Sequence, residues 1–343
     1  MGIKTFILKQ LKEKDFITAT RIAKSQKVSR AFVNKMLQEL RQSGEIILIG
    51  KTNNAKYVLK EKAKKIQGDN LLFNRVLVNK NLLEDVILQE AKDETGIFFN
   101  LKENVAKIVD YGFTEMLNNA IEHSRAKKIS VNCVRGEEGI FFVIKDNGIG
   151  IFNDIKKKFN LPDIFAAVDL LLKGKHTSLP QSHSGEGVFF TSKVADKFAI
   201  KSFNKILSFD NKIDDVSVKD AKILLKGTRV SFFIELESNK ELSDIFNRYS
   251  NENFVFDKTD VRVKILELAS ADYVSRSQAK RLVFGLDKFE SVILDFKNVS
   301  AIGQGFADEV FRVWQKSHSD IKIEFKNANP NVEFMIKRAL AME

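Results

Sequence analysis

The sequence predicts a multidomain chain of mixed α+β class, and three observations lead to this prediction. The length of 343 residues is more than a single hydrophobic core ordinarily serves. Residues 1–68 carry all of the net charge of +11, because acidic and basic residues balance in the remainder. After position 253, short strand patterns alternate with helix patterns, which indicates an α/β layer. We therefore expect domains at 1–68, 101–240 and 254–343, with 69–100 as a helical linker.

The overall composition is that of a folded globular chain, with 44% hydrophobic and 29% charged residues. Cys133 is the single cysteine, which excludes a disulfide framework and a multi-cysteine zinc site. No run approaches the ~20 apolar residues of a membrane-spanning helix. The first residues also lack the apolar segment of a signal peptide. We therefore expect a cytoplasmic protein with no membrane partner.

The first domain shows the pattern of three helices followed by a hairpin. Thr18 and Ser29 are predicted to cap the second and third helices, and Gly44 to end the third. The strand patterns Glu45–Ile49 and Lys56–Leu59 flank a turn-rich segment, which predicts the hairpin. The third helix is expected to bury one apolar face, made of Phe32, Val33, Met36, Leu37 and Leu40.

This order of elements resembles a winged helix-turn-helix domain, in which the third helix enters the major groove of DNA. Side chains expected to point outward from that helix and from the hairpin are Arg30, Asn34, Lys35, Gln38, Arg41, Lys51 and Lys56. Arg, Asn and Gln can pair with base edges, and Lys and Arg can hold phosphates. The resemblance therefore implies DNA as the partner of residues 1–68. The alternative is a winged helix that contacts proteins.

Four short motifs follow in order within residues 100–236, and each combines glycine or a polar residue with the end of a predicted helix or strand. They are Glu115-x-x-x-Asn119, Asp146-x-Gly148-x-Gly150, Gly185-x-Gly187 and Gly227-Thr228. Residues four apart in a helix project from one face, as the first pair would in a helix over 101–124. Glycines allow a backbone to approach a ligand closely. A glycine pair that opens a helix offers free N–H groups to an anion such as phosphate.

Together these motifs resemble the N, G1, G2 and G3 boxes of the GHKL (Bergerat-fold) ATP-binding superfamily. That group includes type II topoisomerases, histidine kinases and anti-sigma-factor serine kinases. The resemblance implies an α/β sandwich that binds ATP and Mg²⁺. It assigns Mg²⁺ to Asn119, the adenine amino group to Asp146, and the role of general base to Glu115. The other ATP-binding residues that it implies are Gly148, Gly150, Gly185, Gly187 and Thr228, the last supporting the adenine-binding carboxylate through a water.

The type of ATP chemistry follows from two departures. None of the four histidines precedes residue 101, which excludes histidine autophosphorylation in the usual layout. Glu122 stands where histidine kinases usually carry Lys or Arg, and this favours an ATPase over phosphoryl transfer. The helix after Gly187 is also similar to that of anti-sigma kinases, so a serine/threonine kinase acting on another protein is the alternative. A third reading is a DNA-binding factor with a vestigial ATP fold.

Residues 254–343 resemble a STAS-like domain, on the run Val292–Ile302 and the helix that follows it. The resemblance implies a protein partner for this domain. Antagonists of this class carry a phosphorylated serine before that helix, whereas this chain has Gly303-Gln304-Gly305, so we do not expect self-phosphorylation. Three aromatic residues of the helix are expected to pack in the core, namely Phe306, Phe311 and Trp314.

The leading hypothesis is an ATP-binding regulator of transcription that couples the nucleotide state of its core to the DNA-binding and STAS-like modules. ATP and Mg²⁺ are expected to order residues 151–184 as a lid. Members of the superfamily often dimerise, so a homodimer fits the resemblance, although no segment marks an interface. Hydrolysis, the DNA target and the identity of the protein partner stay open at this point.

Overall fold

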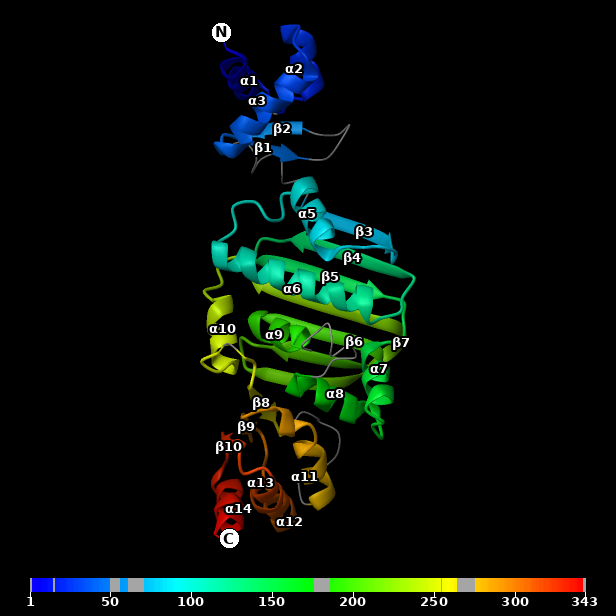
Figure 1. The fold of residues 1–343 in the computed structure, drawn as a ribbon, viewed down its shortest axis with the longest axis vertical. Coiled ribbons are helices and arrows are strands. Elements are labelled where there is room, and N and C mark those ends of the chain that lie inside the picture. The colour runs from blue at the N-terminus through cyan, green and yellow to red at the C-terminus, as the bar shows by residue number, and fades with distance from the viewer. Residues whose placement is uncertain are drawn as a thin grey trace.

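The computed structural model describes residues 2–14, 16–49, 56–60, 71–175, 186–253, 255–263 and 275–341. Three bodies of mixed α and β structure follow one another along the longest axis of the chain, from the N-terminus to the C-terminus (Figure 1). No helix in these ranges is both long and apolar enough to cross a lipid bilayer.

The N-terminal body contains three helices and a two-stranded antiparallel sheet. Its elements are α1 (Ile3–Glu13), α2 (Ala19–Gln26), α3 (Arg30–Gln42), β1 (Ile46–Ile49) and β2 (Lys56–Leu59). The Thr18 hydroxyl accepts a hydrogen bond from the N–H of Arg21 at 3.3 Å, and the Ser29 hydroxyl accepts one from Phe32 at 3.2 Å. Both predicted helix caps are therefore confirmed.

The apolar face of α3 is narrower than predicted. Val33, Leu37 and Leu40 are buried, but Phe32 is 45% exposed. Residue 32 lies one step around the helix from Val33, at the edge of the stripe that the other elements cover. The prediction that Phe32 belongs to the buried face is therefore wrong.

The central body is a five-stranded antiparallel sheet in the order β3-β4-β5-β7-β6, with helices packed against it. The strands are β3 (Leu72–Val78), β4 (Lys128–Arg135), β5 (Gly139–Asp146), β6 (Lys197–Asp210) and β7 (Asp215–Glu235). The helices are α5 (Glu84–Glu94), α6 (Glu103–Glu122), α7 (Ile151–Lys158), α8 (Ile164–Lys173), α9 (Gly187–Val194) and α10 (Leu242–Tyr249).

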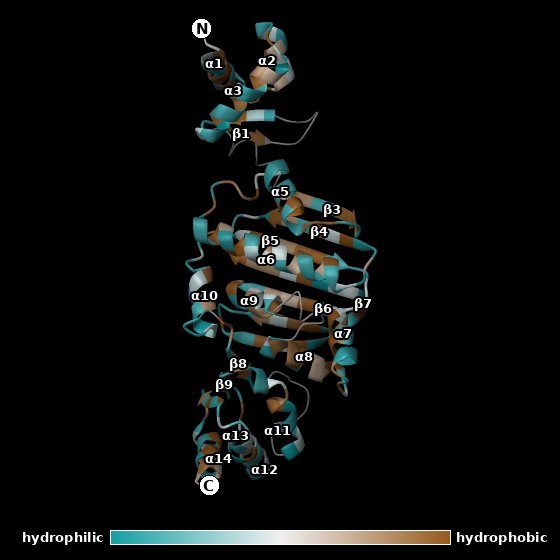
Figure 2. Ribbon diagram, viewed as in Figure 1, coloured by the Kyte–Doolittle hydropathy of each residue, from teal (hydrophilic) through white to brown (hydrophobic). Residues whose placement is uncertain are grey.

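Helices α6 and α9 pack against each other on one face of this sheet (Figure 1). The core beneath α6 is aromatic: the rings of Phe142 and Phe232 stack at 4.5 Å, and Phe113 meets Phe142 edge-on at 5.6 Å. Hydrophobic residues run along the sheet strands, whereas the outer helix surfaces are mostly hydrophilic (Figure 2). The helices that carry the first and third motifs therefore lie on the same face of the sheet.

Residues 72–78 correct our expectation of a helical linker over 69–100. They form β3, which pairs with β4 from Leu72 opposite Val134 to Val78 opposite Lys128. Apolar residues occupy both faces of this edge strand, so its sequence lacks the alternation that marks a strand. Pairing with β4 decides the conformation, and the helical part of the segment begins only at Glu84.

Strand β7 also differs from the prediction, because the Gly227-Thr228 motif, expected at the end of a strand, lies inside it. The strand begins at Asp215, and its register against β6 shifts between the pairs Ser202–Thr228 and Phe203–Leu225. Gly227 lies within this irregularity at a φ of +86°, a conformation that favours glycine. The glycine therefore marks a bulge inside a long strand.

The C-terminal body is a three-stranded parallel sheet in the order β10-β9-β8. Its strands are β8 (Lys258–Arg262), β9 (Ser291–Asp295) and β10 (Lys322–Lys326), and its helices are α11 (Arg276–Val283), α12 (Gln304–Asp308), α13 (Gln315–Ser317) and α14 (Pro330–Leu340). A π-helical turn joins α12 to α13. Phe306 and Phe311 are buried and Trp314 packs partly buried against the same core, as predicted.

Candidate nucleotide site

Asp146 ends β5 and is only 3% exposed. Its Oδ1 accepts a hydrogen bond from the N–H of Gly148 at 2.7 Å, and its Oδ2 accepts one from the N–H of Thr228 at 3.1 Å. Burial raises the pKa of this carboxyl above its usual value, while the hydrogen bonds act in the opposite direction. A carboxylate can accept about four hydrogen bonds, so Asp146 retains capacity for a ligand donor.

The loop after β5 lies too close to its neighbours to carry side chains at two positions. A Cβ on Gly148 would lie 1.9 Å from the main-chain oxygen of Ser124, just beyond the end of α6. Gly150 has a φ of +81°, and a Cβ there would lie 2.5 Å from the hydroxyl of Ser202. The absence of side chains at these glycines allows the loop to pack closely against the end of α6 and against β6.

Thr228 joins this loop to β7. Its N–H bonds Asp146, and its hydroxyl accepts a hydrogen bond from the N–H of Ile151 at 2.9 Å. A Cβ on the preceding Gly227 would lie 2.5 Å from Oδ1 of Asp146. The support that the resemblance assigned to a water is direct here. We call Asp146, Gly148, Gly150, Gly227 and Thr228 together the β5 end.

Helices α6 and α9 meet at two contacts that give their relative direction. A Cβ on Gly187 would lie 2.0 Å from Oε2 of Glu115, and a Cβ on Gly112 would lie 3.3 Å from Cγ2 of Thr191. Helices α9 and α6 therefore run in opposite directions. The N-terminus of α9, with N–H groups that lack intrahelical acceptors, points toward the C-terminal part of α6.

Asn119 lies one turn beyond Glu115 in that part of α6, on the same helix face. The Nδ2 atom of Asn119 is buried and has no hydrogen-bond partner. Such an unsatisfied group costs about 1–3 kcal/mol, so a ligand oxygen placed there would be stabilised. We call Glu115, Asn119 and Gly187 together the α9 end.

Sequence analysis missed two features near these residues, a buried tyrosine and a basic cavity. Burial, together with the charges of Glu115 and Glu186, raises the pKa of Tyr111 well above its usual value. This phenol therefore stays neutral beside the two carboxylates. A cavity of about 480 Å³ adjoins the β5 end and is lined by Arg125, Ile149, Asn153, Asp154, Lys157 and Lys158. The run of three lysines in α7 was the available signal for this basic cavity.

The structure brings most of the predicted nucleotide-site residues together in the two groups named above. Gly185 lies outside the described residues, as do positions 176–184 of the expected lid. In the N-terminal body the predicted DNA-facing side chains of α3 are all exposed, namely Arg30, Asn34, Lys35, Gln38 and Arg41. Lys56 is exposed on β2 with its Nζ 4.5 Å from the ring centroid of Phe16, and Lys51 lies outside the described residues.

This arrangement fits ATP with Mg²⁺ in its donor chemistry. The β5 end offers a buried acceptor, and the α9 end offers helix N–H groups and an unsatisfied amide. An amide oxygen is also a ligand that Mg²⁺ accepts alongside phosphate oxygens. A sheet covered on one face by helices, with these polar groups at a strand end and at a helix end, is compatible with a nucleotide-binding domain.

Comparison with known families identifies the class. A family model described as a histidine kinase-like ATPase domain matches residues 85–207. A second family model, described as a STAS-like domain of unknown function (DUF4325), matches residues 278–333. No curated protein and no solved structure matches the chain. The chain therefore carries a histidine kinase-like ATPase domain, a class that binds ATP, typically with Mg²⁺, followed by a STAS-like domain.

Proposed function

We propose that this chain is an ATP-binding regulator of transcription, in which the β5 end holds adenine and the α9 end holds the phosphates. The buried carboxylate of Asp146 carries the proposal, since it keeps acceptor capacity beside a loop that packs closely against its neighbours at two glycines. The amino group of adenine is a donor at the position where guanine has an oxygen. An ionised Asp146 would therefore select adenine and repel guanine.

The α9 end supplies complementary chemistry for the phosphates. Helix N–H groups at Gly187 would bind phosphate oxygens, and Asn119 would ligate Mg²⁺, which neutralises phosphate charge when bound. Glu115 would act as general base. Its carboxylate would take a proton from water while the water oxygen bonds the γ-phosphorus and the bond to the ADP oxygen breaks.

Substitution of Asp146 by Asn tests the proposed adenine site. Asn has one acceptor oxygen, so it cannot bond Gly148, Thr228 and the adenine amino group as a carboxylate does. We expect affinity for ATP, measured by calorimetry, to fall about 100-fold or more. Asp215→Asn is the matched control because that side chain is exposed at the start of β7. Equal ATP affinity in wild type and Asp146→Asn would rule out the adenine assignment.

Hydrolysis rather than transfer is the proposed fate of ATP. The position before α12 that would carry a phosphoacceptor hydroxyl is Gly303, and Gln304 opens the helix. Phosphate release by wild type and by Glu115→Ala measures the role of the base, and we expect a loss of at least 100-fold. Transfer of labelled γ-phosphate to a separate STAS protein would instead support the anti-sigma-type kinase.

We further propose that the N-terminal body is a winged helix that binds DNA through α3. The exposed basic and amide side chains of α3, in a region that carries all of the excess positive charge, support this. Arg30→Ala combined with Lys35→Ala should weaken DNA binding and flatten its dependence on salt. Unchanged affinity and salt slope would contradict the groove assignment.

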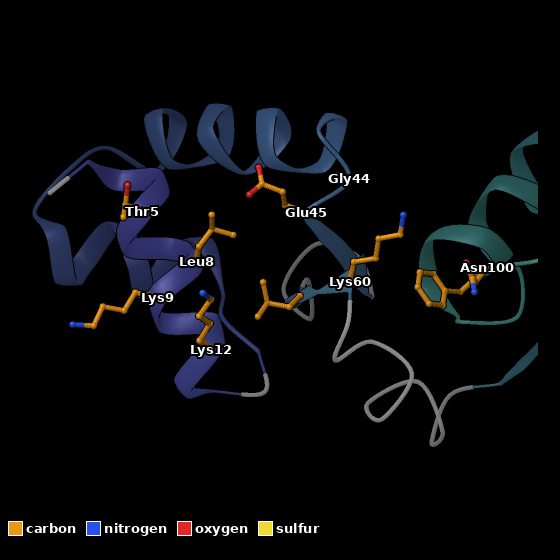
Figure 3. A pocket seen from close by; sticks show the side chains of 10 residues that line it. Thr5, Leu8, Lys9, Lys12, Gly44, Glu45, Lys60 and Asn100 are labelled. Carbon is orange, nitrogen blue, oxygen red and sulfur yellow. The ribbon is translucent and has the colours of Figure 1, made fainter.

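A charge-matched control comes from another side of the same body. Lys9 and Lys12 of α1 line a cleft of about 850 Å³, and Asn100 of the ATPase domain lines it as well (Figure 3). Lys9→Ala combined with Lys12→Ala removes the same charge from the cleft. We expect this pair to reduce DNA affinity less than the α3 pair, because only α3 would enter the groove.

A further inference from the structure

Lys173, the last residue of α8, is completely buried although it is a lysine. Its Nζ donates to Oδ2 of Asp169 at 2.6 Å and to the main-chain oxygens of Arg281 and Phe284 at 3.3 and 3.0 Å. An ammonium has three N–H groups, so each has an acceptor. Two of the acceptors lie at the C-terminal end of α11, where a cation is favoured. Lys173 therefore ties the ATPase domain to the STAS-like domain.

The neighbouring residues extend this attachment. The hydroxyl of Thr259, in β8, donates to the main-chain oxygen of Lys173 at 2.8 Å. The Nζ of Lys175 donates to the main-chain oxygen of Lys288 at 2.8 Å. Lys173 and Lys175 are thus hydrogen-bonded to three separate segments of the STAS-like domain, and we call these contacts the lysine clamp.

Aromatic rings connect the same region to α9. Phe189 and Phe190 of α9 lie 4.7 and 5.0 Å from the ring of Phe256, which meets Phe289 of the STAS-like domain at 5.4 Å. A Cβ on Gly174, which has a φ of +79°, would lie 2.8 Å from the Phe256 ring. Phe189 and Phe190 therefore belong to the hydrophobic core of the STAS-like domain, whereas Val188 beside them packs against the core of the central sheet.

We propose that the STAS-like domain regulates the nucleotide site by holding α9 in its phosphate-facing position. This proposal rests on the proposed binding of ATP at that site. The rings of Phe189 and Phe190 and the N–H groups near Gly187 belong to one short helix, so fixing the rings fixes the N–H groups. When α9 is already ordered, ATP binding loses less conformational entropy. The coupling is reciprocal: bound ATP strengthens the domain contact by the same factor by which the contact raises ATP affinity.

Lys173→Met is the most direct test, because methionine keeps most of the unbranched side chain and removes the three hydrogen bonds. We expect ATP affinity to fall roughly five- to 100-fold. Lys205→Met is the matched control: Lys205 is also buried, and its ion pair with Asp220 at 2.5 Å lies within the ATPase domain. Thr259→Val removes a hydrogen bond of the lysine clamp from the STAS-like domain, and it should also lower ATP affinity.

Hydrogen exchange on wild-type protein tests the reciprocal effect without any substitution. Saturating ATP and Mg²⁺ should slow exchange of amides within 281–288, at the end of α11 and beyond it. Unchanged exchange there, or unchanged ATP affinity in folded Lys173→Met and Thr259→Val, would overturn the coupling while leaving ATP binding intact. Failure of wild type to bind ATP would overturn the proposed function and this inference together.

Discussion

The β5 end and the α9 end of the candidate site differ in what surrounds their glycines. At the β5 end, a Cβ on Gly148 would meet a main-chain oxygen at 1.9 Å. At the α9 end, a Cβ on Gly187 would meet the tip of the Glu115 side chain at 2.0 Å. A main-chain atom moves only if the fold moves, whereas a carboxylate tip can rotate away. The geometry of the β5 end is therefore fixed by the main chain, whereas the geometry of the α9 end can adjust.

The two ends also depend on different domains. The hydrogen bonds of Asp146 stay within the ATPase domain, between β5, its loop and β7. Helix α9 instead packs its aromatic rings into the core of the STAS-like domain. The difference implies that base recognition is local, whereas phosphate recognition is open to control by a neighbouring domain. The predictions below separate the two properties.

The largest effect is expected from Gly148→Ala. The added methyl would clash with the main chain at Ser124, so the loop or the end of α6 must shift, which costs about 3 kcal/mol of unfolding free energy. Denaturant unfolding measures this cost, and ATP affinity should fall with it. Gly136→Ala is the control, since a Cβ there meets nothing nearer than 3.8 Å. Equal stability of the two variants would contradict a fixed β5 end.

A smaller effect, confined to the phosphates, is expected from Gly187→Ala. Alanine favours the helix over glycine by up to about 1 kcal/mol. This gain offsets the cost of displacing the Glu115 carboxylate, so the unfolding free energy should change little. The methyl would push the Glu115 carboxylate away from α9 and into the space for phosphate. We expect ATP affinity to fall about tenfold while affinity for adenosine is unchanged. Equal losses for both ligands would show that the two ends are not independent.

The smallest effect is a pH dependence that arises at Asp146. Burial raises the pKa of this carboxyl, so it accepts a proton at a higher pH than an ordinary aspartate. As the pH rises through that pKa, the Asp146 contribution to folding stability is lost, while the carboxylate needed for adenine forms. ATP affinity should therefore fall on acidification before ordinary aspartates titrate. Calorimetry across pH measures it, and an identical profile in Asp146→Asn would contradict the assignment.

Parts of the β5 end and of the α9 end could be predicted from the sequence, because those residues are close together in the chain. Asp146, Gly148 and Gly150 lie within five positions, and Glu115 and Asn119 lie within one helical turn. Short spacing fixes how such residues face each other before any tertiary structure is known. The caps at Thr18 and Ser29 were predictable for the same reason, since each bonds an N–H three residues later.

The domain contact could not be predicted, because its partners are distant in the chain. Lys173 bonds residues 108 and 111 positions away, and no spacing rule joins them. The available signal was a lysine at the end of the apolar helix α8, with Asp169 one turn earlier. Strand β3 escaped prediction for a related reason, since pairing with β4 fixes its conformation.

Hydrogen exchange on the wild-type chain, titrated with ATP in the presence of Mg²⁺, tests the central claim most directly. ATP bound as proposed should slow exchange of amides 146–151 at the β5 end and 186–190 at the start of α9. Adenosine should protect the first segment alone, because it has no phosphate. Protection of neither segment at saturating ATP, or equal protection of both by adenosine, would contradict a site with a fixed base end and an adjustable phosphate end.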